Sequence, residues 1–142
     1  MPNTQKKKAI DRRAERWARK RLPLICQEHH IHQPDLTWRR SAVKEYTSGH
    51  TRWGLGWSSV VVTEGNHGPI NYWGIDPLVD AKSVFLHEMA HAITKHGHDD
   101  KFYECFWRMA RAEKLPLREV AKREARRGPG RRQYLATRPG RG

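Results

Sequence analysis

The spacing of apolar residues predicts a helix near the N-terminus. Its apolar and small side chains recur at helical intervals, at Ile10, Ala14, Trp17 and Ala18. Pro23 is expected to end this helix. The resulting apolar stripe is narrow, so the helix should dock on a core without forming one by itself.

The middle of the chain has strand character. Large apolar and polar residues alternate in LTWRR from Leu36, and the segment TRWGLGWSSVVVTEG contains the β-branched run Val60–Thr63 before a turn at Gly65 and Asn66. Short strands joined by turns favour antiparallel pairing. We therefore expect a small antiparallel sheet before Trp73.

A second helix is predicted after the sheet. Asp76 followed by Pro77 is typical of an N-cap and a first helical residue, although Asp80 offers an alternative cap. The helix is expected to continue to Gly97, because glycine readily takes the left-handed conformation that ends a helix.

A third helix is predicted from about Asp99 to Lys114. Phe102, Phe106 and Met109 form its apolar face, which should pack on the second helix. Asp99 or its neighbour Asp100 is expected to cap this helix, with orientation of a metal-bound histidine as the other possible role.

The C-terminal segment begins as a helix and is then expected to lose order. Pro116 stands at a helix-start position before LREVAKREARR. From Gly128 onward the Gly, Pro and Arg content argues against packing, so this tail is predicted to be disordered.

Charge divides the 142-residue chain, which is long enough for one domain, into three parts. Residues 1–22 carry nine Lys/Arg and two acidic residues, as do residues 116–142, so each arm has a net charge of +7. Residues 23–115 are nearly neutral. The arms should attract nucleic acid by neutralising phosphates, whereas the alternative is that they are solvated tails.

The compartment is predicted from what the composition lacks. Two cysteines, Cys26 and Cys105, are too few for a disulfide framework and are expected to be reduced. No apolar stretch has the length of a membrane span, and no signal peptide is recognisable. We expect a soluble, cytoplasmic protein that does not enter a membrane.

The sequence HEMAH at 87–91 predicts a metal site. His87 and His91 are four residues apart, so both imidazoles project from one helix face and can bind the same ion. Glu88, beside the first ligand, is placed to act as a general base. The motif also arises by chance in a chain rich in histidine and glutamate, so a third ligand is needed.

Two histidines compete for the role of third ligand. If the helix continues, His96 lies on roughly the opposite side from His87, whereas His98 follows the expected turn at Gly97 and can swing towards the ion. We therefore favour His98. Three protein ligands would leave the fourth tetrahedral position open, as in catalytic zinc sites.

These residues resemble the SprT-like and WLM zinc metalloproteases, including the Spartan proteases. The resemblance is carried by LHEMAH and GHDDKF, and more weakly by TRWG at 51–54, and covers about Leu36 to Met109. We expect an α+β fold in which a small antiparallel sheet packs on a zincin-type catalytic helix, with helical basic arms. The resemblance implies zinc held by His87, His91 and His98, and Glu88 as acid/base. The chain departs from the family in its GLGW stretch and in lacking a four-cysteine zinc ribbon.

The function that follows is zinc-dependent hydrolysis of peptide bonds in proteins bound to nucleic acid, with DNA as the expected partner. An ImmA-like regulatory peptidase that cleaves a repressor, and a non-enzymatic DNA- or RNA-binding module, are the alternatives. The donor that stabilises the oxyanion stays open between Tyr72, Tyr103 and the basic residues.

Two further features are assigned structural roles. The cluster CQEHHIHQ at 26–33 matches no tetrahedral ligand spacing and is interpreted as a surface or helix-end segment. Trp38, Trp53, Trp57 and Trp73 are expected to fill the core beside the sheet, with an exposed tryptophan stacking on unpaired bases as the alternative.

Overall fold

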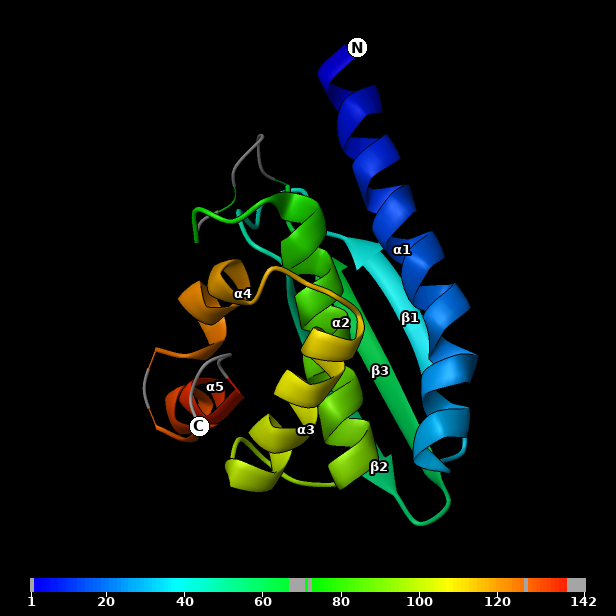
Figure 1. Cartoon of the computed structure of the whole chain (residues 1–142). Helices are drawn as coiled ribbons and strands as arrows, with labels where there is room; N and C mark the ends of the chain where they lie inside the picture. Colours follow the sequence, from blue (N-terminus) through cyan, green and yellow to red (C-terminus); the bar gives the residue numbers. More distant parts are fainter. Residues whose placement is uncertain (1, 67–70, 72, 127, 138–142) are drawn as a thin grey trace.

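The computed structural model in Figure 1 describes residues 2–66, 71, 73–126 and 128–137, with side chains from residue 12 onward. This part of the chain is α+β, as predicted, with five helices and one three-stranded sheet. Their order is α1 (Pro2–His29), β1 (Asp35–Arg40), β2 (Ser48–Gly54), β3 (Trp57–Glu64), α2 (Pro77–Thr94), α3 (Asp100–Ala112), α4 (Leu117–Glu124) and α5 (Pro129–Thr137).

The sheet is mixed, so the expectation of a purely antiparallel sheet is wrong. Its strand order is β1-β3-β2, with β2 antiparallel and β1 parallel to β3. The chain passes from one edge strand, β1, to the other edge strand, β2. The hairpin after β2 then places β3 between them. Alternation within each strand predicts the strands but contains no information about their order.

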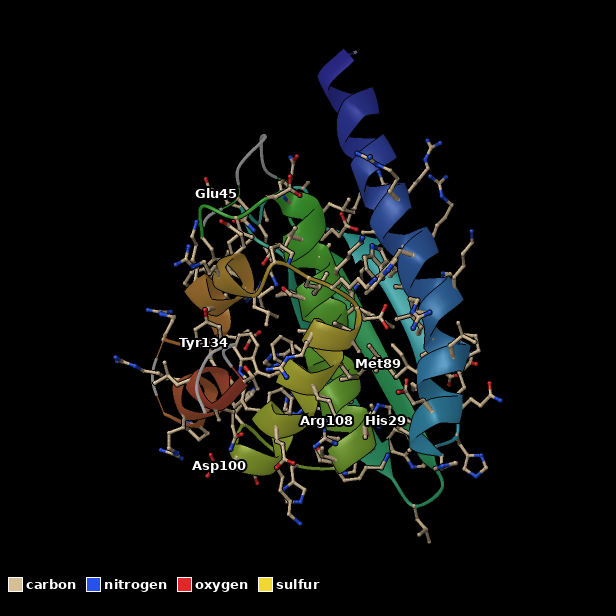
Figure 2. The ribbon with its side chains drawn as sticks, viewed as in Figure 1. His29, Glu45, Met89, Asp100, Arg108 and Tyr134 are labelled. Carbon is tan, nitrogen blue, oxygen red and sulfur yellow. The ribbon has the colours of Figure 1, made fainter. Side chains whose placement is uncertain are left out.

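The helices cover one face of the sheet (Figure 1). Helix α2 lies against β2 and β3, α3 packs on the side of α2 away from the sheet, and α5 packs on α3. The core between these layers contains large, fully buried side chains, among them Met89, which is labelled in Figure 2. The largest are Trp107, Phe85, Phe102 and Phe106. Each such side chain contributes roughly 1.5–3 kcal/mol when buried.

Helix α1 runs past Pro23 to His29, so its predicted end is wrong. An interior proline costs about 3 kcal/mol of helix stability. Here the ring is exposed and the flanking Leu22 and Ile25 are buried, at 4% and 2% exposure, so their packing offsets that cost. The narrow apolar stripe of α1 docks on the core as expected. The helix is continuous across residue 22, where the charge pattern placed the end of the basic N-terminal arm.

The start of α2 is confirmed and its end is not. The Asp76 carboxylate accepts hydrogen bonds from the backbone N–H groups of Leu78 and Val79, at 2.9 and 3.3 Å. The left-handed residue is Lys95, with φ of 57°, and its N–H donates to the carbonyl of His91. The chain therefore leaves the helix two residues before Gly97.

The cap and the apolar face of α3 agree with the sequence. Asp99 accepts a hydrogen bond from the Phe102 N–H at 3.0 Å and is the N-cap. Phe102, Phe106 and Met109 are buried. Their core role is confirmed.

The prediction of a disordered tail from Gly128 is wrong for residues 129–137, which form α5. The Trp107 indole N–H donates to the Gly130 carbonyl at 3.0 Å, and the Trp107 and Tyr134 rings lie 5.0 Å apart. This docking onto a buried tryptophan compensates for the poor helix-forming composition. Residues 138–142 lie outside the described part.

The tryptophans divide differently from the expectation. Trp53 and Trp57 in the β2–β3 hairpin are 38% and 54% exposed, so a core role is wrong for them. Trp38 packs against the core as expected, with its ring 6.4 Å from that of Phe85. Trp107 and the half-buried Trp17, which packs edge-on against Phe85, supply further bulk. None of the described helices has the length and apolarity needed to cross a membrane.

Candidate metal centre

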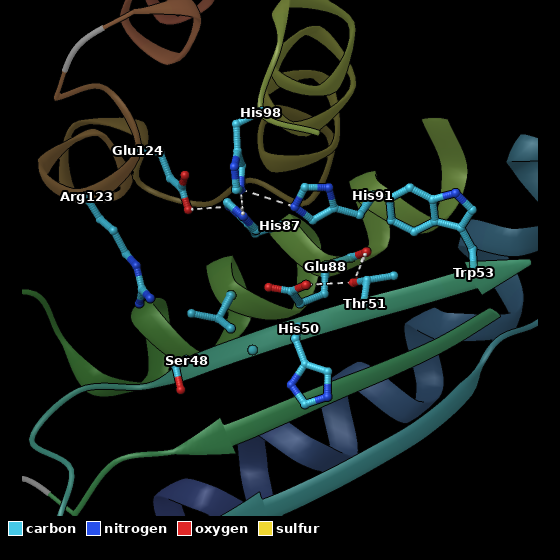
Figure 3. A pocket seen from close by; sticks show the side chains of 12 residues that line it. Ser48, His50, Thr51, Trp53, His87, Glu88, His91, His98, Arg123 and Glu124 are labelled. Carbon is cyan, nitrogen blue, oxygen red and sulfur yellow. Dashed lines mark hydrogen bonds and ion pairs between the residues drawn. The ribbon is translucent and has the colours of Figure 1, made fainter. Parts of the chain in front are cut away.

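Three histidines converge at the end of α2. His87 and His91 lie one turn apart on this helix, and His98 comes from the segment that joins α2 to α3. The Nε2 atom of His98 lies 2.9 Å from that of His87 and 3.2 Å from that of His91 (Figure 3). Nitrogens bound to one tetrahedral zinc at about 2.0–2.1 Å are separated by roughly 3.3 Å. The triad is therefore compatible with a metal ion.

His96 is directed elsewhere. Its Nδ1 contacts the carboxylate of Asp99 at 2.6 Å, and its backbone carbonyl accepts a hydrogen bond from Nδ1 of His91 at 2.7 Å. The structure thus brings His98, and not His96, to His87 and His91. The reason differs from the expected one, because the chain turns at Lys95.

The two helical histidines have fixed partners on their second ring nitrogen. Nδ1 of His87 lies 2.8 Å from Oε2 of Glu124, and Nδ1 of His91 donates to the carbonyl of His96. Because both partners are acceptors, the neutral form of each ring carries its proton on Nδ1, and Nε2 then keeps its lone pair directed towards the other histidines. This is the tautomer that binds a metal through Nε2.

Glu124 is the site residue that sequence reasoning missed. It ends α4, is 6% exposed, and also accepts a hydrogen bond from the Tyr103 hydroxyl at 3.3 Å. One signal was available, because Leu117, Val120 and Glu124 share one face of a helix at positions i, i+3 and i+7. A carboxylate on the buried face of an otherwise basic helix needs a buried partner.

A second contact fixes α4 beside the site. Arg123 donates to the fully buried carboxylate of Asp80 on α2 at 2.9 Å. Adjacent residues of α4 therefore contact α2 at two points, Asp80 and His87, which lie two turns apart on α2. This pairing determines where the Glu124 carboxylate lies.

Burial and neighbouring charges set the protonation of the triad. Burial lowers the pKa of His91 to about 4 and also lowers the pKa of His98. Burial opposes the charge of His87 as well, but the adjacent Glu124 carboxylate raises its pKa overall. Burial likewise disfavours the Glu124 anion, yet His87 and Arg123 lower the pKa of Glu124. His91 and His98 are therefore neutral at pH 7, the form that metal binding requires.

Glu88 lies in the same cleft, beneath the triad (Figure 3). Its Oε1 accepts a hydrogen bond from the Thr51 hydroxyl of β2 at 2.6 Å, and burial raises its pKa. A side chain at Gly49 would place a Cβ atom 2.8 Å from Cγ of Glu88, so the absence of one at this position makes room for the carboxylate. A raised pKa suits a group that accepts and returns a proton.

Aromatic rings pack against the histidines. The Phe102 ring lies 4.2 Å from that of His91, nearly parallel, and 4.7 Å from that of His87. Trp53 stacks on His91 at 6.3 Å. These contacts restrict rotation of the imidazole rings. Phe102 therefore both fills the core and positions two of the histidines.

The triad and Glu88 line a cleft of about 380 Å³ between β2, α2 and α4. Of the candidate oxyanion donors, the Tyr103 hydroxyl is bonded to Glu124, and Tyr72 lies outside the described residues. Arg123 lines the cleft from α4.

Neither the histidine cluster at residues 26–33 nor the two cysteines have the ligand arrangement of the triad. Within the described residues, His87, His91 and His98 are the one group of three or more potential ligands close enough to share an ion. Cys26 and Cys105 are free thiols, and burial raises the pKa of Cys105 to about 11. Cys26 is buried and Cys105 is half-buried.

Comparison of the chain with protein-family models, curated proteins and solved structures finds no match. The resemblance to SprT-like proteases accordingly rests on the residues themselves and stays a prediction. The donor set, three imidazole nitrogens with an adjacent carboxylate, is one that zinc accepts.

Proposed function

We propose that the chain is a zinc-dependent peptidase in which His87, His91 and His98 hold the metal and Glu88 is the catalytic acid/base. The observation that carries the proposal is the convergence of three Nε2 atoms beside a buried carboxyl group in one cleft. Zinc would supply a Lewis acid that polarises the scissile carbonyl and activates water.

The protein's own groups divide the remaining work. Glu88 receives the proton of the attacking water and returns it to the leaving amide nitrogen. Thr51 holds one carboxylate oxygen by its hydroxyl, so the other is left to face the reaction. Glu124 and the carbonyl of His96 keep two imidazoles in the required tautomer.

The arrangement of β2 favours a peptide substrate. In the described part of the chain β2 pairs on one side only, with β3, and it contributes Gly49, Thr51 and Trp53 to the cleft. An extended peptide can add to such an edge through backbone hydrogen bonds. Its scissile bond would then lie beside Glu88.

We also propose that nucleic acid recruits the substrate. Exposed cations of α1 (Arg12, Arg13, Arg16 and Lys20) and of the C-terminal arm give the chain much of its net charge of +13. Proteins bound to the same polyanion would reach the cleft at raised local concentration. Because α1 and α5 pack on the core, the contribution of either arm is measured by neutralising exposed charges and not by truncation.

The test measures zinc content and hydrolysis together. Wild type, Glu88→Gln, His98→Ala and the matched control His96→Ala are purified, and each is assayed for zinc by elemental mass spectrometry and for cleavage of fluorescently labelled casein. Glu88→Gln preserves shape and the acceptor for Thr51, so it should keep zinc while turnover falls at least about 100-fold. His98→Ala should lose both, and His96→Ala should keep both.

The contrary outcomes are distinct. Undiminished cleavage by Glu88→Gln would remove the acid/base role, and loss of zinc in that variant would make Glu88 a ligand. A wild-type chain that takes up no zinc after refolding with the metal would favour the non-enzymatic binding module.

A further inference from the structure

The face of the sheet opposite the helices carries side chains in an ordered array. The strand register places Asp35, Ser59 and Arg52 in one row across the three strands, and Arg39, Thr63 and Ser48 in another. Gly54 and Trp57 pair at one end of β2 and β3. No described helix covers this face, because the helices lie on the side of Val60 and Val62 (Figure 1).

The chemistry of this outer face is cationic and polar. Arg39, Arg52 and His50 are exposed, and Lys44 reaches its edge by donating to the Ser48 hydroxyl at 3.0 Å. Arg39 donates to the Thr63 hydroxyl at 3.3 Å, which holds its guanidinium over the sheet. Asp35 is the one carboxylate in the paired rows. The remaining positions are hydroxyls and Val61.

Trp57 supplies an aromatic plane beside these charges. Its indole lies over Gly54, where a Cβ atom would be 2.7 Å from Cε2 of the ring, yet 54% of the residue remains exposed. Trp53 of the same hairpin points to the other face, where it stacks on His91. The two exposed tryptophans are therefore divided between the cleft and the outer face.

We propose that the outer face of the sheet binds single-stranded nucleic acid, with a base stacked on Trp57 and phosphates neutralised by Arg52, Arg39 and Lys44. An exposed indole offers a base the same apolar plane that a neighbouring base would, and it does so for any sequence. Sheet faces with aromatic and basic side chains bind unpaired strands in this way. Bases in a duplex are already stacked, so a duplex gains nothing from Trp57.

The position of this face links it to the cleft. Thr51 directs its side chain towards Glu88, whereas its neighbours His50 and Arg52 direct theirs to the outer face, as His50 does in Figure 3. A nucleic acid bound to the outer face is thus separated from the cleft only by the thickness of β2. This inference deepens the proposed recruitment by nucleic acid, and it is tested without any protein substrate, so failure of the peptidase would leave it standing.

The experiment measures binding of the full chain to fluorescein-labelled oligothymidylate of about 15 nucleotides by anisotropy, beside oligouridylate and a DNA duplex. Trp57→Ala should raise the dissociation constant for the single strands roughly 5- to 100-fold. Trp57→Phe should restore most of the affinity. The matched control Trp53→Ala, in the same hairpin, should stay within about twofold of wild type. Unfolding midpoints exclude a folding defect.

The charges are tested with their own control. Arg52→Ala and Arg39→Ala should each reduce the slope of log affinity against log salt by about 0.7, the value for one phosphate of a single strand. Arg108→Ala, which removes an exposed arginine of α3 on the far side of the molecule, should leave the slope unchanged.

Two results would overturn the inference. A loss in Trp57→Ala no greater than that in Trp53→Ala, or duplex affinity that matches single-strand affinity in every variant, would show that binding does not depend on a base stacked on Trp57. Photocrosslinking with thio-substituted oligothymidylate gives an independent reading. Crosslinks on β2 and β3 support the outer face, and crosslinks confined to α1, α4 or α5 contradict it.

Discussion

The two basic arms have the same charge and different structural roles. Helix α1 directs an apolar stripe of Ala14, Ala18, Leu22 and Ile25 into the core, and none of its described side chains lines the cleft. Helix α4 buries Val120 in the core and also delivers Arg123 and Glu124 to α2, where Glu124 contacts His87. Net charge therefore says little about an arm's structural role, which depends on the residues that face inward.

The largest effect should come from the inward face of α1. Ile25→Ala removes a side chain that is 2% exposed, and should lower the free energy of unfolding by about 2–5 kcal/mol. The adjacent Leu24→Ala is the control, because Leu24 is 49% exposed and should cost no more than about 0.5 kcal/mol. Denaturant unfolding measures both. Zinc affinity of folded Ile25→Ala should equal that of wild type, and a parallel loss would mean that α1 also shapes the site.

An intermediate effect is expected from the inward face of α4. Glu124→Ala leaves Nδ1 of His87 without its acceptor, so zinc affinity measured by chelator competition should fall about 10- to 100-fold. Glu124→Gln keeps an acceptor oxygen and should lose less. Glu119→Ala, on the same helix and paired with Lys122 at the surface, should not change the affinity. Unchanged zinc binding in Glu124→Ala would remove the distinction between the arms.

The smallest effect should come from the outward faces, where the arms are alike. Arg13→Gln on α1 and Arg118→Gln on α4 each remove one exposed cation. Each should weaken nucleic-acid binding a few-fold at about 0.1 M salt and reduce its salt dependence by less than one unit of slope. Titrations at several salt concentrations measure this. A large loss of affinity from only one of these two substitutions would show that the arms also differ in how their charge contributes to nucleic-acid binding.

The sequence was sufficient for features determined within a few residues. The cap at Asp76, the apolar face of α3 and the one-turn spacing of His87 and His91 all follow from local periodicity, and the structure agrees with each. The convergence of His98 on these two was also anticipated, although the helix ends at Lys95 and not at Gly97.

Features that depend on contacts between residues distant in sequence were not predicted. The parallel pairing of β1 with β3, the continuation of α1 through Pro23 and the folding of α5 each require a partner far away in sequence. Glu124 lies 37 positions from His87, and only the docked position of α4 joins them. Tertiary packing overrode local propensity in every one of these cases.

The separation of His87 from Glu124 also orders events in time. A ribosome adding about 5–20 residues per second needs roughly 2–7 s to extend the chain from one to the other. During that interval HEMAH exists without the carboxylate that holds its first imidazole. A nascent chain that stops short of Glu124 therefore lacks the acceptor for His87, and this contact can form only after α4 has been synthesised and has docked on α2.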